Sequence, residues 1–278
     1  MLALVLPYID LPSLPLPFGL SIHPFGVFSA LGAYLGARLA MYAGRVYGPG
    51  DTRVLAGVFT WAIVGGVLGA HLLHVLGYHP ELLRAAGPWV LLKVWDGVSS
   101  MGGVLGGLAG IVLYFRAHAQ PVRPYLNALA LGTAPGWAVA RIGCALVHDH
   151  PGVRSDAWFA VAFPGGARLD MGLIDCLLLA TLSAVLWLLA RRRWHPGFLM
   201  GVLAVAYCVP RFFLDFLRAQ DLAFVDGRLG GLTPAQWVSP VLALTGLYLV
   251  VSRPRPAGSI RSPDPVVEAA VRPRSSVG

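Results

Sequence analysis

Residues 140–152 read Ala-Arg-Ile-Gly-Cys-Ala-Leu-Val-His-Asp-His-Pro-Gly and close a long apolar run. Arg141 lies near the end of that run, and His148, Asp149 and His150 follow it before the Pro-Gly pair. An arginine that cannot reach water is costly in lipid, and such residues are usually paired or line a functional cavity. The segment therefore indicates a membrane helix that ends at a functional surface.

The composition is that of a polytopic membrane protein. Hydrophobic residues make up 56% of the 278 residues and charged residues only 12%, and the mean hydropathy is +0.69. A soluble domain carries about 25% charged residues, so a large soluble helical domain is the weaker alternative. A helix of about 20 apolar residues crosses a bilayer. Seven such stretches occur, at 19–41, 54–76, 98–117, 126–147, 171–190, 197–217 and 236–252. We therefore expect an all-α integral membrane protein with seven transmembrane helices.

The basic residues indicate how these helices are oriented. Alternate connections collect 13 and 6 Lys and Arg residues, or 8 and 6 without the C-terminal tail. Basic residues near helix ends favour the cytoplasm, so we expect the N-terminus outside and the C-terminus in the cytoplasm. The first basic residue is Arg38, so the chain lacks the charged start of a signal peptide, and the first helix should remain. The orientation of the helices accounts for the excess of Lys and Arg, so we do not expect nucleic acid as a partner.

Three regions outside the helices complete the expected plan. Residues 1–18 contain four prolines, which interrupt a helix, and should lie along the outer membrane surface. The seven-helix domain covers 19–252 and includes, between its fourth and fifth helices, a small extracytoplasmic cap at about 148–170. That cap should contain a short strand or two, at 158–163 and near residue 168. Residues 253–278 are rich in Pro, Ser and Arg and are expected to be a disordered basic cytoplasmic tail.

Polar side chains gather at the outer end of the predicted bundle. The fourth and sixth helices both end there, so Arg141 and Arg211 should lie at one level. Guanidinium groups match phosphate oxygens bidentately, and the nearest phosphate is a phospholipid head group. The structural alternative for Arg211 is an ion pair with Asp215, four residues along the helix. Other polar residues predicted at this end are His23, His71, His74, Asp96, Ser99, Ser100, His148, Asp149, His150, Asp170, Asp175 and Gln236.

The string Gly-Gly-Val-Leu-Gly occurs twice, at 65–69 and 102–106. Glycines let transmembrane backbones approach each other, and packing alone suffices for the first copy. In the second copy, Gly102 and Gly103 sit at the outer helix end, where bare N–H groups could also meet an anionic group. His23, at the outer end of the first helix, is read as an interfacial side chain first and as a substrate contact second.

His148, Asp149 and His150 are consistent with acid/base chemistry or with a metal site. Histidines two residues apart share a metal ion only on a strand or loop, and no third ligand stands at a diagnostic spacing. A thiol in an apolar segment behaves as a small hydrophobe. The thiols so placed are those of Cys144, Cys176 and Cys208. We therefore expect no metal, no cofactor and no disulfide.

Five groups of residues stand in the order and spacing of a known family's motifs. They are Gly69-Ala70-His71-Leu72; Trp95-Asp96-Gly97 with Ser100-Met101-Gly102-Gly103; Arg141-Ile142-Gly143-Cys144; Tyr207, Arg211-Phe212, Asp215-Phe216 and Arg218; and Gln236-Trp237-Val238-Ser239. The chain thereby resembles the prolipoprotein diacylglyceryl transferase family over about residues 19–252. Members move the diacylglyceryl group of phosphatidylglycerol onto the cysteine thiol of a bacterial prolipoprotein, releasing glycerol phosphate.

The resemblance implies a multi-pass enzyme of the bacterial cytoplasmic (inner) membrane with its active face extracytoplasmic. Its partners would be phosphatidylglycerol, membrane lipid and a prolipoprotein signal peptide with its lipobox cysteine, and we expect a monomer. The family's two essential arginines correspond to Arg141 and Arg211, which would hold the lipid phosphate and stabilise the departing glycerol phosphate. Gly102, Gly103, His23, Asp215 and Gln236 would contact the substrates.

The chain departs from the family at one important position. The histidine that usually precedes the glycine pair, and that is proposed to activate the thiol, is Met101 here. Methionine cannot accept a proton, so His148 or His150, oriented by Asp149, is the hypothetical replacement. Further departures are Phe25 for a tyrosine, His71 for an arginine, and residues 144–149 and 169–175.

These departures mark a divergent member or paralogue. The first alternative is a non-catalytic paralogue that binds phospholipid or lipoprotein with the same fold. A transporter or channel would place polar residues at the membrane midplane, where these helices hold almost none.

Overall fold

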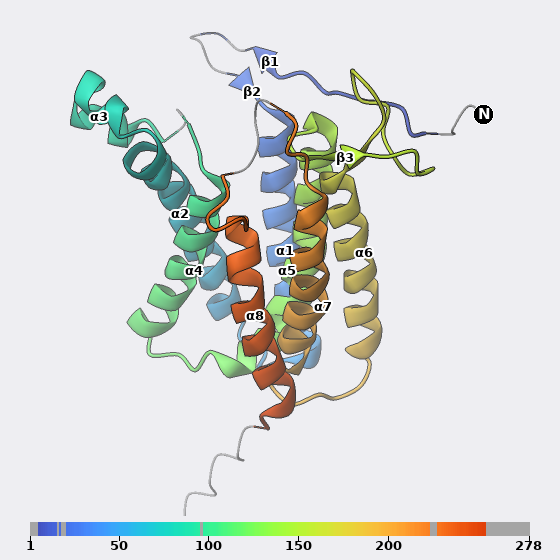
Figure 1. The fold of residues 1–278 in the computed structure, drawn as a ribbon. Coiled ribbons are helices and arrows are strands. Elements are labelled where there is room, and N and C mark those ends of the chain that lie inside the picture. The colour runs from blue at the N-terminus through green and yellow to red at the C-terminus, as the bar shows by residue number, and fades with distance from the viewer. Residues whose placement is uncertain (1–4, 16, 18–20, 95–96, 223–226, 254–278) are drawn as a thin grey trace, which may run out of the picture.

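The computed structural model describes residues 5–15, 17, 21–94, 97–222 and 227–253. In this part of the chain, seven long helices form the body of the protein (Figure 1). They are α1 (Pro24–Tyr47), α2 (Thr52–Leu73), α4 (Ser100–Ala117), α5 (Leu126–Val147), α6 (Met171–Leu189), α7 (Phe198–Leu214) and α8 (Pro234–Val251). Each predicted apolar stretch coincides with one of them, so the expectation of an all-helical core is confirmed.

Shorter elements extend or join these helices. The helical turns are η2 (His74–Tyr78) after α2, α3 (Pro80–Ala86), η3 (Pro88–Leu92), η4 (Arg123–Tyr125) before α5, and η5 (Asp215–Leu217) after α7. Two short antiparallel pairs join β1 (Leu14–Pro15) to β2 (Ser21–Ile22) and β3 (Pro151–Arg154) to β4 (Arg168–Asp170). Both pairs lie at the same end of the helical body (Figure 1).

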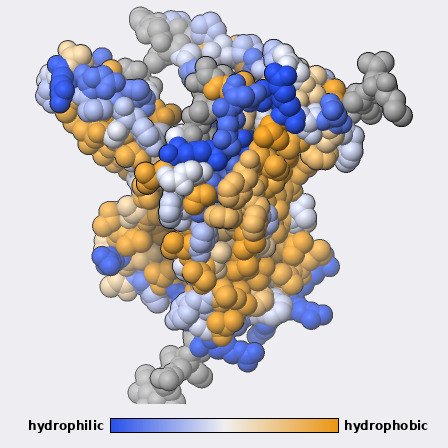
Figure 2. Space-filling model, in the orientation of Figure 1, coloured by the Kyte–Doolittle hydropathy of each residue, from blue (hydrophilic) through white to orange (hydrophobic). Residues whose placement is uncertain are grey.

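The outside of the helical body is apolar. Among the residues that the structure describes, five segments are long and apolar enough to cross a membrane: Thr52–Tyr78, Arg123–Val147, Met171–Leu189, Phe198–Leu217 and Pro234–Val251, and a shorter apolar helix covers Met101–Ala117. Figure 2 shows hydrophobic residues over the middle of one face and hydrophilic ones above and below it. Large apolar side chains that are more than half exposed include Leu31, Val64, Leu113, Leu177 and Leu244. Such a surface is stable against lipid and not against water, so this is an integral membrane protein.

Glycine pairs bring the helices into contact. Between α1 and α5, a Cβ atom on Gly136 would lie 2.5 Å from the carbonyl oxygen of Gly32. Between α2 and α4, a Cβ atom on Gly106 would lie 2.1 Å from the carbonyl oxygen of Gly65. Any side chain larger than hydrogen would push these backbones apart. The packing role predicted for the repeated glycine string is therefore confirmed.

The cap between α5 and α6 is built on the β3–β4 pair. Arg154 lies opposite Arg168 in this pair, so the strand predicted near residue 168 is confirmed. The strand predicted at 158–163 is wrong, because this segment contributes only isolated bridges, from Val161 to Leu6 and to Arg168. A tight turn at 157–160, closed by a backbone hydrogen bond from the Ala160 N–H to the Ala157 carbonyl, occupies the first part of this segment.

The segment before α1 is attached to the cap. The backbone of Leu6 exchanges hydrogen bonds with Ala160 and Ala162, and the Leu11 N–H donates to the carbonyl of Leu146 at the end of α5. These contacts bind the N-terminal segment to protein. Its predicted position along the membrane surface stays a prediction.

Parts of the predicted plan fall outside the described residues. They include the tail from residue 254 onward and Trp95 and Asp96 of the motif before α4, and the side chain of Ser100 is not described either. The predictions made for these residues stay predictions.

The glycine contacts allow a direct test of the packing. We expect Gly106→Ala to destabilise the protein by about 1–3 kcal/mol, because the new methyl group overlaps the backbone of α2. The measurement is the midpoint of thermal unfolding of the full chain in detergent. Gly26→Ala in α1 is the control, since nothing lies within 4 Å of its Cβ position. Equal midpoints for the two variants would contradict the packing role.

Candidate active site

Two arginines meet on one buried carboxylate at the cap end of the bundle. Arg141 belongs to α5, Arg211 to α7 and Asp175 to α6. The Asp175 Oδ2 atom lies 3.5 Å from Arg141 Nε and 3.6 Å from Arg211 Nη1. The two arginines therefore lie at one level, as the helix topology predicts. Three different helices must hold their positions for this contact to form.

Asp215 holds Arg211 from a second side. Its Oδ1 atom is 2.7 Å from Arg211 Nη1, so the predicted ion pair is present, and the Thr233 hydroxyl donates to its other oxygen. Gln236 forms a capping box with Thr233 at the start of α8, and its Nε2 donates to the carbonyl of Phe212 at 3.1 Å. Asp215 and Gln236 thus support Arg211 within the protein. Their predicted contacts to substrate stay predictions.

A chain of contacts continues from Asp215 into the cap. Asp215 Oδ1 lies 3.9 Å from Arg218 Nη1, and Arg218 Nη2 donates to His150 Nδ1. The Nε2 atom of His150 is 3.7 Å from Asp149 Oδ1. The loop after α5 is therefore linked to the end of α7.

Cys144 closes these contacts into a ring. Its Sγ atom lies 3.6 Å from Arg141 Nη1, and its sulfur and ligand atoms of Asp149 and His150 all lie within 4.8 Å of one another. We call these eight side chains the polar ring. Its members are Cys144, Arg141, Asp175, Arg211, Asp215, Arg218, His150 and Asp149.

The polar ring balances its charges yet leaves hydrogen-bonding capacity unused. Its three arginines face three aspartates, so the formal charge is zero when all six are ionised. Within the described part of the chain, four buried atoms lack an aligned hydrogen-bond partner despite these ion pairs. They are Arg141 Nε, Arg211 Nη1, Asp175 Oδ1 and Asp215 Oδ1. A buried donor without an acceptor costs about 1–3 kcal/mol, so an anionic ligand would stabilise both arginines.

His148 lies apart from the polar ring. It ends α5 in a left-handed backbone conformation, with φ of 49°, which is uncommon for a residue other than glycine. Its Nδ1 is 2.6 Å from Asp170 Oδ2, its Nε2 is 3.2 Å from the carbonyl oxygen of Ile9, and its ring stacks on Tyr8. One ring nitrogen is thus bonded to the cap and the other to the N-terminal segment. The structure therefore gives no support to His148 as a proton acceptor oriented by Asp149.

The other predicted contacts are the glycines of α4 and His23. The Gly102 N–H donates to the Ser99 side chain at 3.2 Å, and the Gly103 N–H donates to the Ser99 carbonyl at 2.9 Å. His23 is exposed and lies 2.8 Å from the hydroxyl of Ser21. Partners within the chain thus occupy both glycine N–H groups. Anion binding at Gly102 and Gly103 and substrate contact at His23 stay predictions.

The loop after α5 holds two groups with shifted pKa values. Burial raises the pKa of Asp149 to about 6, although Arg141 and Arg218 favour its charged form. Burial, followed by the charges of Arg218, Arg141 and Arg211, lowers the pKa of His150 to about 2. His150 is therefore uncharged at neutral pH and has one donor and one acceptor nitrogen. Because Arg218 donates to Nδ1, the hydrogen belongs on Nε2, which faces Asp149.

An apolar groove of about 590 Å³ lies beside the polar ring, between α6 and α7. Its lining consists of Ile174, Leu177, Leu178, Thr181, Pro210, Phe213, Leu214 and Leu217. Ile174 directly precedes Asp175, and Leu214 directly precedes Asp215. The groove therefore lies on the apolar outer side of α6 and α7 and includes the helix turns that carry the two aspartates, and its lining suits an apolar ligand.

Comparison with known proteins decides the family. The family model described as prolipoprotein diacylglyceryl transferase matches residues 14–252. This chain belongs to that family. A phosphatidylglycerol–prolipoprotein diacylglyceryl transferase of Cereibacter sphaeroides is 32% identical over 295 residues, which covers 90% of this chain and 99% of that protein. Proteins of the same name come from Ruegeria pomeroyi, 32% identical with 83% and 92% covered, and from Tolumonas auensis, 28% identical with 84% and 91% covered.

In this member of the prolipoprotein diacylglyceryl transferase family, the structure gives roles to three residues that the motifs left without one. Asp175 joins the two arginines, Arg218 links α7 to the cap, and Cys144 closes the polar ring. An aspartate inside an apolar helix is costly unless paired, and that signal identifies Asp175 in the sequence. The sequence contains no comparable signal for Cys144. Its neighbours Asp149 and His150 approach it through the turn after α5, which the sequence does not predict.

The pairing of Asp175 with both arginines predicts a large effect of its removal. We expect Asp175→Asn to destabilise the protein by about 3–5 kcal/mol, because two buried guanidinium groups lose a shared counter-charge. Thermal unfolding of the purified full chain in detergent measures this effect. The matched control is Asp156→Asn, an exposed aspartate of the cap. If both variants unfold at the wild-type temperature, Asp175 does not hold the site together.

Proposed function

We propose that this protein transfers the diacylglyceryl group of phosphatidylglycerol to the lipobox cysteine thiol of prolipoproteins and releases glycerol phosphate. The observation that carries this proposal is the pairing of Arg141 and Arg211 on the buried Asp175, in a chain of the transferase family. Both arginines retain donor atoms without aligned acceptors among the described residues. A phosphate group supplies such acceptors.

We further propose that all seven long helices cross the bacterial inner membrane, with the N-terminus outside. The connection between α6 and α7 carries Arg191, Arg192 and Arg193 and lies at the end opposite the cap (Figure 1). Basic connections favour the cytoplasm, which supports an extracytoplasmic cap and polar ring. We expect the protein to act as a monomer, because a single chain supplies the whole polar ring.

In the proposed reaction the thiolate sulfur of the prolipoprotein attacks the glyceryl carbon bonded to the phosphate oxygen. A carbon–sulfur bond forms, the carbon–oxygen bond breaks, and glycerol phosphate leaves with the bonding electron pair. Arg141 and Arg211 bind the phosphate oxygens on which this charge gathers. The groove between α6 and α7 has an apolar lining against which the acyl chains can lie.

The thiol must lose its proton before this attack. Met101 cannot accept it, and His148 is engaged by Asp170 and the N-terminal segment. We propose Asp149 as the acceptor, because His150 donates toward it and leaves its carboxylate as the open basic group beside Arg141. The Asp149 side chain is 38% exposed, so a substrate thiol can reach it.

The competing proposal is a non-catalytic paralogue that binds lipid or lipoprotein, and Met101 is the residue that favours it. Complementation of a conditional strain that lacks its own transferase separates the two. Rescue by the wild-type chain supports the enzyme. Absence of rescue by a chain that is stably inserted in the membrane supports the binding protein.

Replacement of Arg141 tests the phosphate site. We expect Arg141→Ala to lower transfer at least about 100-fold, because one phosphate donor is lost where charge develops. Arg141→Lys should also be impaired, since an ammonium group cannot bind the phosphate bidentately. The measurement is the gel shift of a lipobox peptide incubated with phosphatidylglycerol vesicles, and Arg154→Ala, an exposed arginine, is the control. Transfer by Arg141→Ala at the wild-type rate would exclude this role.

Replacement of the proposed proton acceptor tests thiol activation. We expect Asp149→Asn to lower kcat about 100-fold or more, with an unchanged KM for phosphatidylglycerol because the arginines still bind the phosphate. The same peptide assay at several lipid concentrations separates the two constants, and Asp156→Asn is the control. A kcat within twofold of wild type would mean that another group takes the proton.

A further inference from the structure

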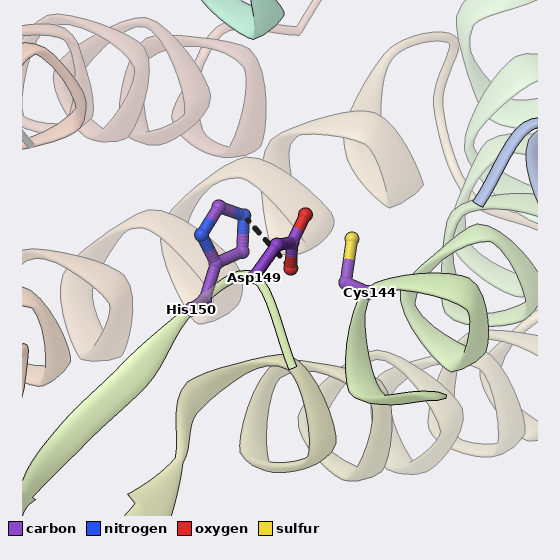
Figure 3. A group of neighbouring side chains, drawn as sticks. All are labelled: Cys144, Asp149 and His150. Atoms are coloured by element: carbon purple, nitrogen blue, oxygen red, sulfur yellow. Dashed lines mark ion pairs between the residues drawn. The ribbon is translucent and has the colours of Figure 1, made fainter. Parts of the chain in front are cut away.

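Three chemically different donor groups converge at the edge of the polar ring. Cys144 lies in the last turn of α5, and Asp149 and His150 lie in the loop that leads into β3 (Figure 3). Their sulfur, carboxylate oxygen and ring nitrogen atoms all lie within 4.8 Å of one another. Figure 3 shows the side chains of Asp149 and His150 side by side, with the Cys144 sulfur facing the carboxylate.

This donor set selects a class of metal ion. Zinc binds thiolate, imidazole and carboxylate ligands, and catalytic zinc sites use three protein ligands and keep a fourth position open. Magnesium and calcium prefer oxygen ligands alone. We propose that Cys144, Asp149 and His150 bind a zinc-class divalent cation whose open position receives the acceptor thiol. This inference rests on the proposed transferase function and specifies how the thiol is activated.

The local charges are compatible with such an ion. A Cys144 thiolate and the Asp149 carboxylate neutralise a divalent cation, and the Arg141 Nη1 atom, 3.6 Å from the sulfur, favours the thiolate form. The positive charges of Arg141 and Arg211 are already compensated by Asp175 and by Asp215. Because Asp149 already balances Arg218 in the metal-free ring, the ion together with the Cys144 thiolate raises the formal charge of the ring from zero to +1.

Binding of the ion requires one rearrangement. The His150 nitrogen that faces Asp149 is Nε2, and it carries the hydrogen while Arg218 donates to Nδ1. Coordination through Nε2 moves this hydrogen to Nδ1, and the Arg218 guanidinium then withdraws toward Asp215, 3.9 Å away. The metal and the Arg218–His150 contact exclude each other, so binding is coupled to a rearrangement of the Arg218 side chain.

The ion would take over thiol activation from the histidine that the family usually has at the position of Met101. A thiol that coordinates such a cation is deprotonated, so its S–H bond breaks as the metal–sulfur bond forms. The proton passes to the Asp149 oxygen that does not bind the metal, in agreement with the acceptor role proposed above. The bound sulfur retains a lone pair and attacks the glyceryl carbon, while the lipid phosphate lies on Arg141 and Arg211. Met101 then needs no proton-accepting role.

Cobalt binding tests the site directly. The purified full chain in detergent is titrated with Co²⁺, and we expect one ion per chain with a thiolate-to-cobalt charge-transfer absorption. Cys144→Ala and Cys144→Ser should both lose this absorption, and Asp149→Asn and His150→Gln should weaken binding at least tenfold. Cys176→Ala is the matched control and should retain it. No charge-transfer absorption in the wild type, or the same absorption in both Cys144 variants, would overturn the proposal.

A second experiment examines the open position and separates this proposal from the transferase function. A lipobox peptide with cysteine should alter the cobalt spectrum, whereas the same peptide with serine should not; equal spectra would overturn thiol coordination. Chelation should abolish transfer and Zn²⁺ should restore it. Full transfer by metal-free protein would overturn the metal proposal and leave the transferase intact. A cobalt-binding protein that transfers nothing in any metal state would instead overturn the proposed function.

Discussion

The carboxylate of Asp175 determines how the site is built, because it contacts both arginines from a position between their helices. A buried guanidinium needs a counter-charge, and a carboxylate shared by two of them brings their donor atoms to one place. Asp215 adds a second counter-charge and is itself held by Thr233 at the start of α8. Four helices are thereby tied together at the cap end. The donors that remain unaligned are the ones that an anionic ligand can use.

This arrangement depends on close packing further along the helices. Gly32 and Gly136 let the backbones of α1 and α5 touch, and Gly65 and Gly106 do the same for α2 and α4. Helix packing in lipid gains little from the hydrophobic effect, so close backbone contact must supply the attraction. Gly136 lies on α5, the helix that carries Arg141 and Cys144, so its contact with α1 supports the helix on which these two groups are carried.

The sequence predicts the helical body well, because the bilayer thickness sets a length of about 20 apolar residues that is easily recognised. It also predicts that Arg141 and Arg211 lie at one level, because the ends of the fourth and sixth helices fall on the same side of the membrane. It fails in the loop after α5, where the left-handed conformation of His148 turns that side chain into the cap. The same turn returns His150 toward Cys144. No local sequence pattern predicts a left-handed turn at a histidine. The sequence therefore does not show that Cys144, which we expected to act as a small hydrophobe, belongs to the polar ring.

Met101 stands where the family usually has a histidine, and the loop after α5 carries other groups that could take over the role of that histidine. Thiol activation requires a group that removes a proton from sulfur, and the described structure offers Asp149, His150 and Cys144 on the side of Arg141 nearest the cap. In the proposed reaction, a base in this loop leaves Arg141 and Arg211 available to bind the phosphate. Arg218 bonds to His150 and lies near Asp215, so it connects this loop to the carboxylate that holds Arg211. The same arginine thus contacts both a residue of the proposed thiol-activating loop and a residue that supports the proposed phosphate site.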